Sequence, residues 1–341
     1  MNLQELYFQI KNNIDSIDFS LLWSGFSPLK FALYDEHSCF FDGKYIDKTD
    51  NFVANTSIFF RGEYIAIWQV NQAINAEILT SKIIHEMFHA FQNLNGESRF
   101  PNEMDSLLHY RYSEVNLSIK AAENRLLAHL MEQFDPDIFQ RFLRLRNYRR
   151  QHFSYELNYE AAIEQIEGSA TYVELASLKQ LSPIKYQQRI SKILSSLRDE
   201  SQLFPIRIFS YEIGAVLFLL AKEQNLSPFE NFSSEPFPLT LLRNVTETEI
   251  APLNSIVQQQ YQSFKEESNE IIRYALELNH CICDKESKLL GINVYDARYE
   301  EPYIISRYFV MYEDEDSTHT VNGNFVIELS QNQSIKRIYQ F

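Results

Sequence analysis

Hydrophobic and polar residues follow three different patterns along the chain. Residues 1–75 begin with a short amphipathic stretch and then become strand-like, most clearly at 57–68, where β-branched and aromatic residues predict one strand or a hairpin. From 76 to 278 the apolar positions recur at helical spacing. From 279 to 341 short apolar or alternating runs are separated by turns such as Asn322-Gly323. The pattern predicts an α+β fold, in which a mainly helical domain at 76–278 carries an N-terminal β-sheet and a small C-terminal β-module.

The segment at about 104–153 is predicted to be a helical hairpin inserted into the helical domain. Asp135-Pro136-Asp137 separates its two arms, because these residues end one helix and begin the next. The second arm carries a basic run, which is typical of a solvated helix face or of pairing with nearby carboxylates. A hairpin that walls or covers a cleft is the alternative. The basic run consists of Arg141, Arg144, Arg146, Arg149 and Arg150.

The most informative motif lies in a helix predicted at 76–94, which ends at Asn95-Gly96. Residues 85–89 read His-Glu-Met-Phe-His. Residues four apart lie on one face of a helix, so His85 and His89 can reach a single metal ion. Glu86 lies beside them, where it can take a proton from a water on the metal. The alternative is a buried helix that carries two incidental histidines.

A catalytic zinc ion needs a third protein ligand and leaves its fourth position to water. Gln92 and Asn95 stand where a metzincin would continue its ligand motif, which excludes that class. The better candidates lie further along the chain and can share one helix face, so any of them could bind the metal while a neighbour holds a histidine. They are Glu160, Glu164 and Glu167.

Glu167 is the favoured third ligand. The residues after it, Gly168-Ser169-Ala170, are small, which suits a helix that must approach a metal closely. Glu174, two turns later on the same face, is predicted to be structural. Tyr211 is one of 20 tyrosines, most of which we expect to be core residues, so its role depends on the segment around it.

Two of these segments carry a resemblance to a known family. Residues 167–174, Glu-Gly-Ser-Ala-Thr-Tyr-Val-Glu, resemble the EGxAxYxE segment of gluzincin metallopeptidases of the M1 aminopeptidase type. Residues 210–217 resemble the YExGxxxL segment of the same family. The resemblance implies a zincin-like catalytic domain in which His85, His89 and Glu167 bind Zn²⁺, Glu86 is the general base and Tyr211 stabilises the oxyanion.

The resemblance covers residues 57–96 and 155–222, which is the catalytic core. Between His89 and Glu167 the chain has 77 residues, 90–166, whereas the family has a short gap. Ile166 stands where the family usually has Asn, and the exopeptidase motif expected before residue 85 is absent. The resemblance therefore supports zinc hydrolase chemistry and does not extend to aminopeptidase specificity.

Composition and charge indicate where the protein acts and what it avoids binding. The net charge of −15 predicts a protein that repels nucleic acid and anionic membranes. The longest apolar run, residues 213–221, is too short to cross a bilayer, and the first residues lack the features of a signal peptide. With three cysteines, this favours the cytoplasm. We expect a zinc-dependent peptidase acting on a peptide or protein. The alternatives are a non-catalytic binding or regulatory protein on a metal-binding gluzincin scaffold and a hydrolase of other amides.

Overall fold

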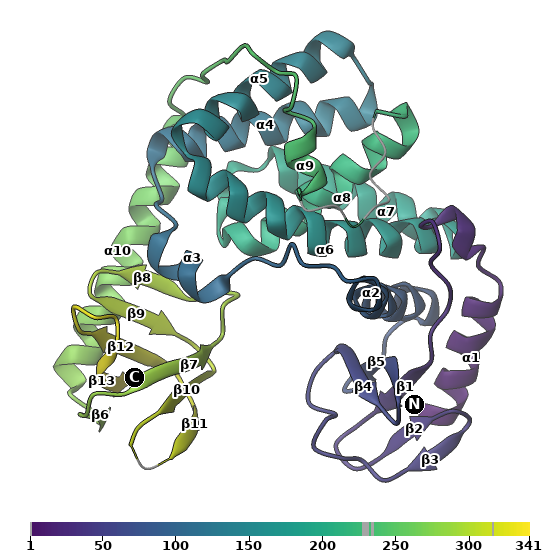
Figure 1. Cartoon of the computed structure of the whole chain (residues 1–341), viewed down its shortest axis with the longest axis horizontal. Helices are drawn as coiled ribbons and strands as arrows, with labels where there is room; N and C mark the ends of the chain where they lie inside the picture. The colour runs from purple at the N-terminus through teal and green to yellow at the C-terminus, as the bar shows by residue number, and fades with distance from the viewer. Residues whose placement is uncertain (1, 227–231, 233–234, 316) are drawn as a thin grey trace.

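The computed structural model describes residues 2–226, 232, 235–315 and 317–341. Helices make up about 52% of the chain and strands about 18%, with the strands gathered at the two ends of the sequence. This segregation of strands from helices confirms the predicted α+β class. Figure 1 shows a layer of helices with the N-terminal sheet below one end and the C-terminal sheets below the other.

The N-terminal sheet has the strand order β3-β2-β1-β5-β4, in which β1 and β5 are parallel and the other neighbours are antiparallel. The segment predicted as one strand or a hairpin is the hairpin β4–β5. Arg61 and Gly62 form its turn with positive φ angles of 51° and 92°, which the tight hairpin turns require. The elements are α1 (Leu3–Asp15), the 3₁₀-helix η1 (Phe19–Leu21), β1 (Phe31–Tyr34), β2 (Cys39–Phe41), β3 (Lys44–Ile46), β4 (Thr56–Phe60) and β5 (Glu63–Gln69).

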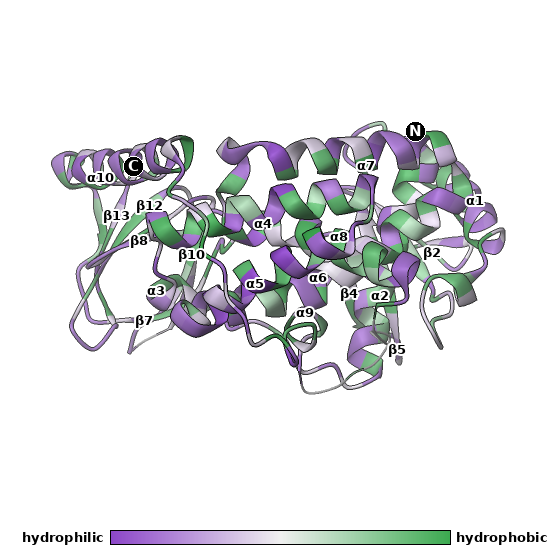
Figure 2. Ribbon diagram, turned by 90° about the horizontal axis from the view of Figure 1, so that it is seen from above, coloured by the Kyte–Doolittle hydropathy of each residue, from purple (hydrophilic) through white to green (hydrophobic). Residues whose placement is uncertain are grey.

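The helical layer is built around α6, which packs against α2 on one side and α8 on another. Figure 2 shows hydrophilic and hydrophobic stripes along α4, α7 and α10, as expected of helices that cover a core on one face. The elements are α2 (Ala76–Leu94), α3 (Glu103–His109), α4 (Glu114–Glu132), α5 (Pro136–His152), α6 (Ser154–Leu181), α7 (Pro183–Arg198), the 3₁₀-helix η2 (Glu200–Leu203), α8 (Ile206–Gln224), α9 (Phe237–Thr240) and α10 (Ser255–Leu278).

Helices α6 and α8 cross in direct backbone contact at two glycines. A Cβ atom on Gly168 would collide with the backbone of Gly214, and a Cβ atom on Gly214 would collide with the backbone at Gly168 and Glu164. We had predicted that the small residues after Glu167 allow close approach to a metal. In the structure, the missing side chain of Gly168 instead allows α8 to lie directly against α6.

The predicted inserted hairpin corresponds to α4 and α5, with Asp135 capping the start of α5 through bonds from the backbone N–H groups of Asp137 and Ile138. Its first arm is shorter than predicted, because α3 is a separate helix and the chain is not helical at 110–113. The hairpin is part of the helical core, since α4 packs against α5, α7 and α8 and α5 packs against α6.

The C-terminal strands form two sheets, with the orders β11-β10-β7 and β6-β13-β12-β9-β8. Helix α10 leads into them, ends at Asn279 in the left-handed conformation, and packs against the larger sheet. The apolar or alternating runs at 290–295, 324–329 and 335–339 correspond to strands, the run at 303–312 is divided into β9 and β10, and β6, β8 and β11 had not been predicted. The strands are β6 (Cys281–Cys283), β7 (Lys288–Ile292), β8 (Arg298–Glu300), β9 (Tyr303–Ser306), β10 (Phe309–Glu313), β11 (Thr318–Asn322), β12 (Phe325–Leu329) and β13 (Ile335–Gln340). Among the described residues, no helix combines the length and the apolar character needed to span a bilayer.

Candidate metal centre

Helix α2 presents its two histidines on the face opposite its apolar side. Asn75 caps the helix by accepting bonds from two backbone N–H groups, and its core face includes Leu79, Ile83, Ile84, Met87 and Phe88. The side chains of His85 and His89 are 13% and 18% exposed. The two imidazoles therefore lie at the edge of the core and face α6, and they are not incidental members of the apolar face.

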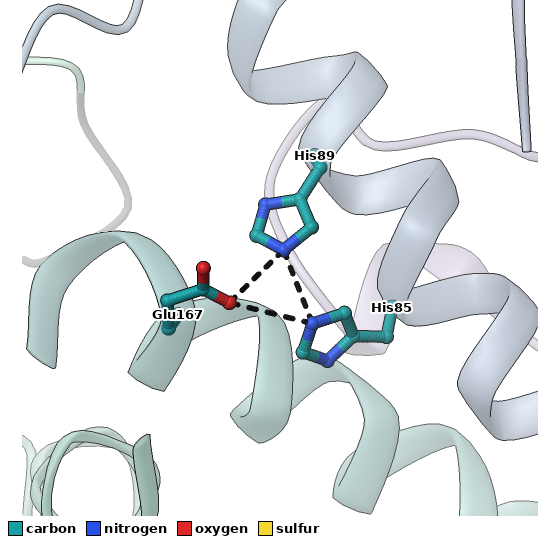
Figure 3. Close-up of side chains that lie close together, drawn as sticks. All are labelled: His85, His89 and Glu167. Carbon is teal, nitrogen blue, oxygen red and sulfur yellow. Dashed lines mark hydrogen bonds and ion pairs between the residues drawn. The ribbon is translucent and has the colours of Figure 1, made fainter. Parts of the chain in front are cut away.

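Three ligand atoms converge between α2 and α6. The Nε2 atoms of His85 and His89 are 3.1 Å apart, and Oε2 of Glu167 lies 3.8 Å from the first and 3.3 Å from the second. Figure 3 shows all three side chains pointing at one another. Ligand atoms about 2.1 Å from a tetrahedral zinc would be about 3.4 Å apart. Two nitrogens and one carboxylate oxygen at these separations are a donor set that fits Zn²⁺.

The structure separates the three glutamates that the sequence left as alternatives. Glu160 accepts bonds from Lys120 at 2.7 Å and from Arg149 at 2.5 Å, and Glu164 pairs with Arg146 at 2.5 Å. All of these side chains are buried. Glu160 and Glu164 are therefore neutralised by fixed cations inside the helical layer, and Glu167 faces the histidines. Four arginines of the basic run on α5 pair with carboxylates, because Arg141 and Arg144 also pair with Glu249, and Arg150 donates to the carbonyl oxygens of Leu242 and Val245.

Gln92 holds His89 in the orientation that a ligand needs. Its Oε1 lies 2.8 Å from Nδ1 of His89, and its Nε2 donates to the carbonyl oxygen of Ile166 and to Oγ of Ser169, both at 3.0 Å. Because the amide nitrogen of Gln92 is committed to these acceptors, its oxygen accepts the Nδ1 proton of His89. In the neutral ring this bond selects the tautomer whose Nε2, the atom that faces His85 and Glu167, is the unprotonated nitrogen. The sequence had offered Gln92 only as evidence against a metzincin.

Glu174 lies at the site, although we had predicted a structural role for it. Its Oε2 is 3.4 Å from Nδ1 of His85, an ion-pair distance whose geometry falls short of a hydrogen bond. Burial raises the pKa of Glu174, but the neighbouring His85, Lys82 and Arg189 outweigh burial and hold it below its usual value. A carboxylate behind a metal-binding histidine orients the ring and increases its basicity.

The same carboxylates control the protonation of His85. Burial favours the neutral ring, yet the ion pairs with Glu167 and Glu174 outweigh it and raise the pKa of His85 to about 10. The pKa of Glu167 is correspondingly held far below its usual value, because the two histidines overcome the effect of burial. Without a metal the cluster therefore carries a proton on His85, and a metal ion must displace that proton to bind.

Glu86 projects from α2 into a cavity next to the three ligands. Burial is the main reason that the pKa of Glu86 is raised; it outweighs the opposing effect of His85 and His89, and the carboxylates of Glu167 and Glu174 add to it. A carboxyl group with a raised pKa is a better proton acceptor at neutral pH than an ordinary surface glutamate. The cavity has a volume of about 250 Å³, and its walls are formed by Trp68, Lys82, His85, Glu86, Thr171, Glu174, Arg189, Ile208, Tyr211 and Glu212. A larger cavity, about 520 Å³, lies between α3 and the C-terminal sheets and does not include the three ligands.

Tyr211 reaches the same cavity from α8, next to a residue that the sequence had not indicated. Its hydroxyl accepts a bond from Nη1 of Arg207, whose Nη2 lies 3.4 Å from Oε1 of Glu167 and whose Nε donates to Glu103 at 2.9 Å. The guanidinium also lies 4.8 Å from the ring centre of Tyr295, between β7 and β8. Burial and the charge of Glu167 keep the pKa of Tyr211 far above its usual value, so its hydroxyl keeps its proton. The spacing of four residues between Arg207 and Tyr211 was the available signal.

Comparison with models of protein families, with curated proteins and with solved structures found no match to this chain.

Proposed function

We propose that this protein is a zinc-dependent metallopeptidase of the gluzincin type, acting in the cytoplasm on a peptide or protein substrate. The observation that supports this most is the convergence of His85, His89 and Glu167 beside a cavity into which Glu86 projects. A zinc that is only structural normally has four protein ligands and has no use for an adjacent base. The three free cysteines fit a reducing compartment.

When bound, zinc would supply a Lewis acid that polarises the scissile carbonyl and acidifies water. In the proposed reaction Glu86 accepts the proton of the attacking water on its carboxylate and then passes it to the leaving amine. Tyr211 donates its hydroxyl hydrogen to the oxygen that becomes negative. Arg207 fixes the hydroxyl oxygen of Tyr211 and the second oxygen of Glu167.

The N-terminal sheet offers a place for an extended substrate. Strand β4 is at the edge of the sheet, and Thr56 at its start pairs with Ile67, the neighbour of Trp68 in the cavity wall. An extended peptide can add to such an edge through main-chain hydrogen bonds. This arrangement would place the peptide next to the cavity.

The test is to measure zinc content and peptide hydrolysis in the same preparations. Glu86→Gln should keep one zinc per chain and lower kcat by about 10²–10⁴-fold, because the base is lost and the ligands remain. His85→Ala should lose zinc. Zinc is measured by elemental analysis and hydrolysis by mass spectrometry on a mixed peptide library.

Glu77→Gln is the matched control, because Glu77 is on the same helix and pairs with Lys185 away from the three ligands. It should keep both zinc and activity. Undiminished hydrolysis by Glu86→Gln would contradict the proposed base, and normal zinc content in His85→Ala would contradict the site. A wild-type protein that binds zinc and cleaves nothing would instead fit a binding or regulatory protein on the same scaffold.

A further inference from the structure

In the described part of the chain, one lysine of the cavity beside the proposed metal site has no carboxylate within ion-pair distance, and its charge acts on Glu174 only at longer range. Arg189 pairs with Glu212 at 3.1 Å, and Glu174 faces His85. Within the described part of the chain, Lys82 makes no hydrogen bond or ion pair, and its Nζ lies 5.9 Å from the ring centre of Trp68. A lysine in a cleft that touches no carboxylate directly can still form a charge-assisted hydrogen bond with a ligand.

The position of Lys82 on α2 limits where that ligand would lie. Lys82 comes three residues before His85 and four before Glu86, so it is on the same helix face, one turn or about 5.4 Å towards the N-terminus. An extended peptide advances about 3.3 Å per residue. A group that contacts Lys82 is therefore about one or two residues from a carbonyl that lies at Glu86.

The other walls of the cavity suit a peptide that carries one negative charge. Trp68 and Ile208 supply apolar surface, and the volume of about 250 Å³ accommodates a few residues at most. The remaining carboxylates in the walls already face a cation, an imidazole or the proposed reacting water. A carboxylate is the chemical group that would pair with the ammonium of Lys82, so that neither charge is left unpaired in the cavity.

We propose that Lys82 binds a carboxylate of the substrate, so that the protein prefers peptides with a negative charge within about two residues of the bond that is cleaved. The carboxylate is either an Asp or Glu side chain or the free C-terminus of the peptide. The part of this inference that concerns substrate specificity rests on the proposed function. The binding of the carboxylate itself can be measured without catalysis.

The first experiment measures binding to zinc-free protein by ligand-observed NMR titration. The probes are acetyl-Ala-Glu-Ala-amide, acetyl-Ala-Gln-Ala-amide and acetyl-Ala-Gln-Ala with a free C-terminus. Tighter binding of the Glu peptide than of the Gln amide, by about tenfold, is expected if a side chain is recognised. Tighter binding of the free acid than of its amide is expected if the C-terminus is recognised. The preference should weaken as salt is added.

Variants assign the preference to Lys82. Lys82→Met keeps the aliphatic stem and should abolish the preference, and Lys82→Glu should turn it against the negatively charged peptides. Lys192→Met is the control, because Lys192 is exposed on α7 and outside the cavity walls. Equal binding of the three peptides to the wild type, absence of binding by all of them, or a preference that survives Lys82→Met would overturn the proposal.

The second experiment compares kcat/KM of the zinc-loaded protein for the same charged and neutral sequences. Lys82→Met should remove the advantage of the charged peptide and leave the neutral peptide within about twofold. If Lys82→Met slowed all peptides equally, the lysine would act on Glu86 and the proposal would be wrong. Selective binding without any cleavage would instead preserve the role of Lys82 and remove the proposed function.

Discussion

Helix α6 carries two pairs of glutamates that have opposite surroundings. Glu160 and Glu164 are completely buried and bonded to lysine and arginine side chains of α4 and α5. Glu167 and Glu174 lie further along the same helix, are partly exposed, and face His85 and His89 of α2. The four residues are chemically identical, so the difference comes from the helix that each pair faces.

The comparison shows what makes a carboxylate available to a metal. A guanidinium or ammonium group keeps its charge at physiological pH, so the carboxylate beside it stays committed to that partner. An imidazole can give up its proton, and both it and the neighbouring carboxylate then become ligands. Arg207 adds a refinement, because it contacts Oε1 of Glu167 and leaves Oε2 to the histidines.

The largest expected effect is on stability, from Glu160→Gln. This change removes the counter-charge of the buried Lys120 and leaves the buried Arg149 only Glu123, and we expect a loss of about 3–5 kcal/mol in the free energy of unfolding. Urea denaturation followed by circular dichroism measures it. Zinc content of the folded variant should equal that of the wild type. Loss of zinc with unchanged stability would reverse the roles that we assign to the two pairs.

Glu160 also makes the free energy of unfolding depend on pH in the acid range. Burial opposes ionisation of Glu160, but Arg149 and Lys120 outweigh it and lower its pKa to about 2, whereas an ordinary glutamate has a pKa of 4.5. Its contribution to stability is present above pH 4.5 and is lost as the pH falls towards 2, because only the unfolded state binds the proton in that range. Glu160→Gln should lack this part of the acid dependence.

A smaller effect is expected from Glu174→Gln. The variant keeps the shape of the side chain and removes the charge behind His85, so zinc affinity should fall by about 10–100-fold. Competition with a chelator of known affinity measures it. Glu164→Gln is the matched control on the other pair and should leave the zinc affinity of the folded protein unchanged. Equal zinc affinity in wild type and Glu174→Gln would show that Glu174 is structural, as the sequence had indicated.

The smallest effect concerns the C-terminal sheets. Tyr295→Ala removes the ring that lies over Arg207, a contact worth about 0.5–1 kcal/mol, so kcat should fall about two- to fivefold. Tyr308→Ala is the control, because Tyr308 is a highly exposed tyrosine of the same part of the chain. Steady-state kinetics at one zinc concentration compares the two. An identical kcat for both would show that the C-terminal sheets do not support the site through Arg207.

Sequence reasoning was most successful where the signal is local. The helix with His85 and His89, the α+β class and the strands β12 and β13 follow from periodicity, which a single segment displays by itself. The preference for Glu167 over Glu160 and Glu164 came from the small residues after it and from a resemblance, since all three glutamates can share one helix face. Glu160 and Glu164 cannot be metal ligands because they pair with side chains of α4 and α5. Helical spacing does not show which helix will lie opposite a given glutamate.

The residues that were missed act across larger separations. Gln92 and Glu174 each orient a histidine, but their partners become visible only when α2 and α6 are packed together. The break between α3 and α4 was missed because the apolar positions continue through it. Gly168 was assigned to the wrong neighbour, because a small residue in a sequence shows that something comes close and does not show what.

The crossing of α6 and α8 at Gly168 and Gly214 limits how far mutations can alter the geometry of the site. Gly168 directly follows Glu167, and Gly214 comes three residues after Tyr211, so main chain touching main chain fixes the spacing of these two side chains. Core substitutions elsewhere can be absorbed by rotamer changes, but backbone in contact has no such freedom. The separation of Glu167 and Tyr211 is therefore among the features of this protein least open to gradual adjustment.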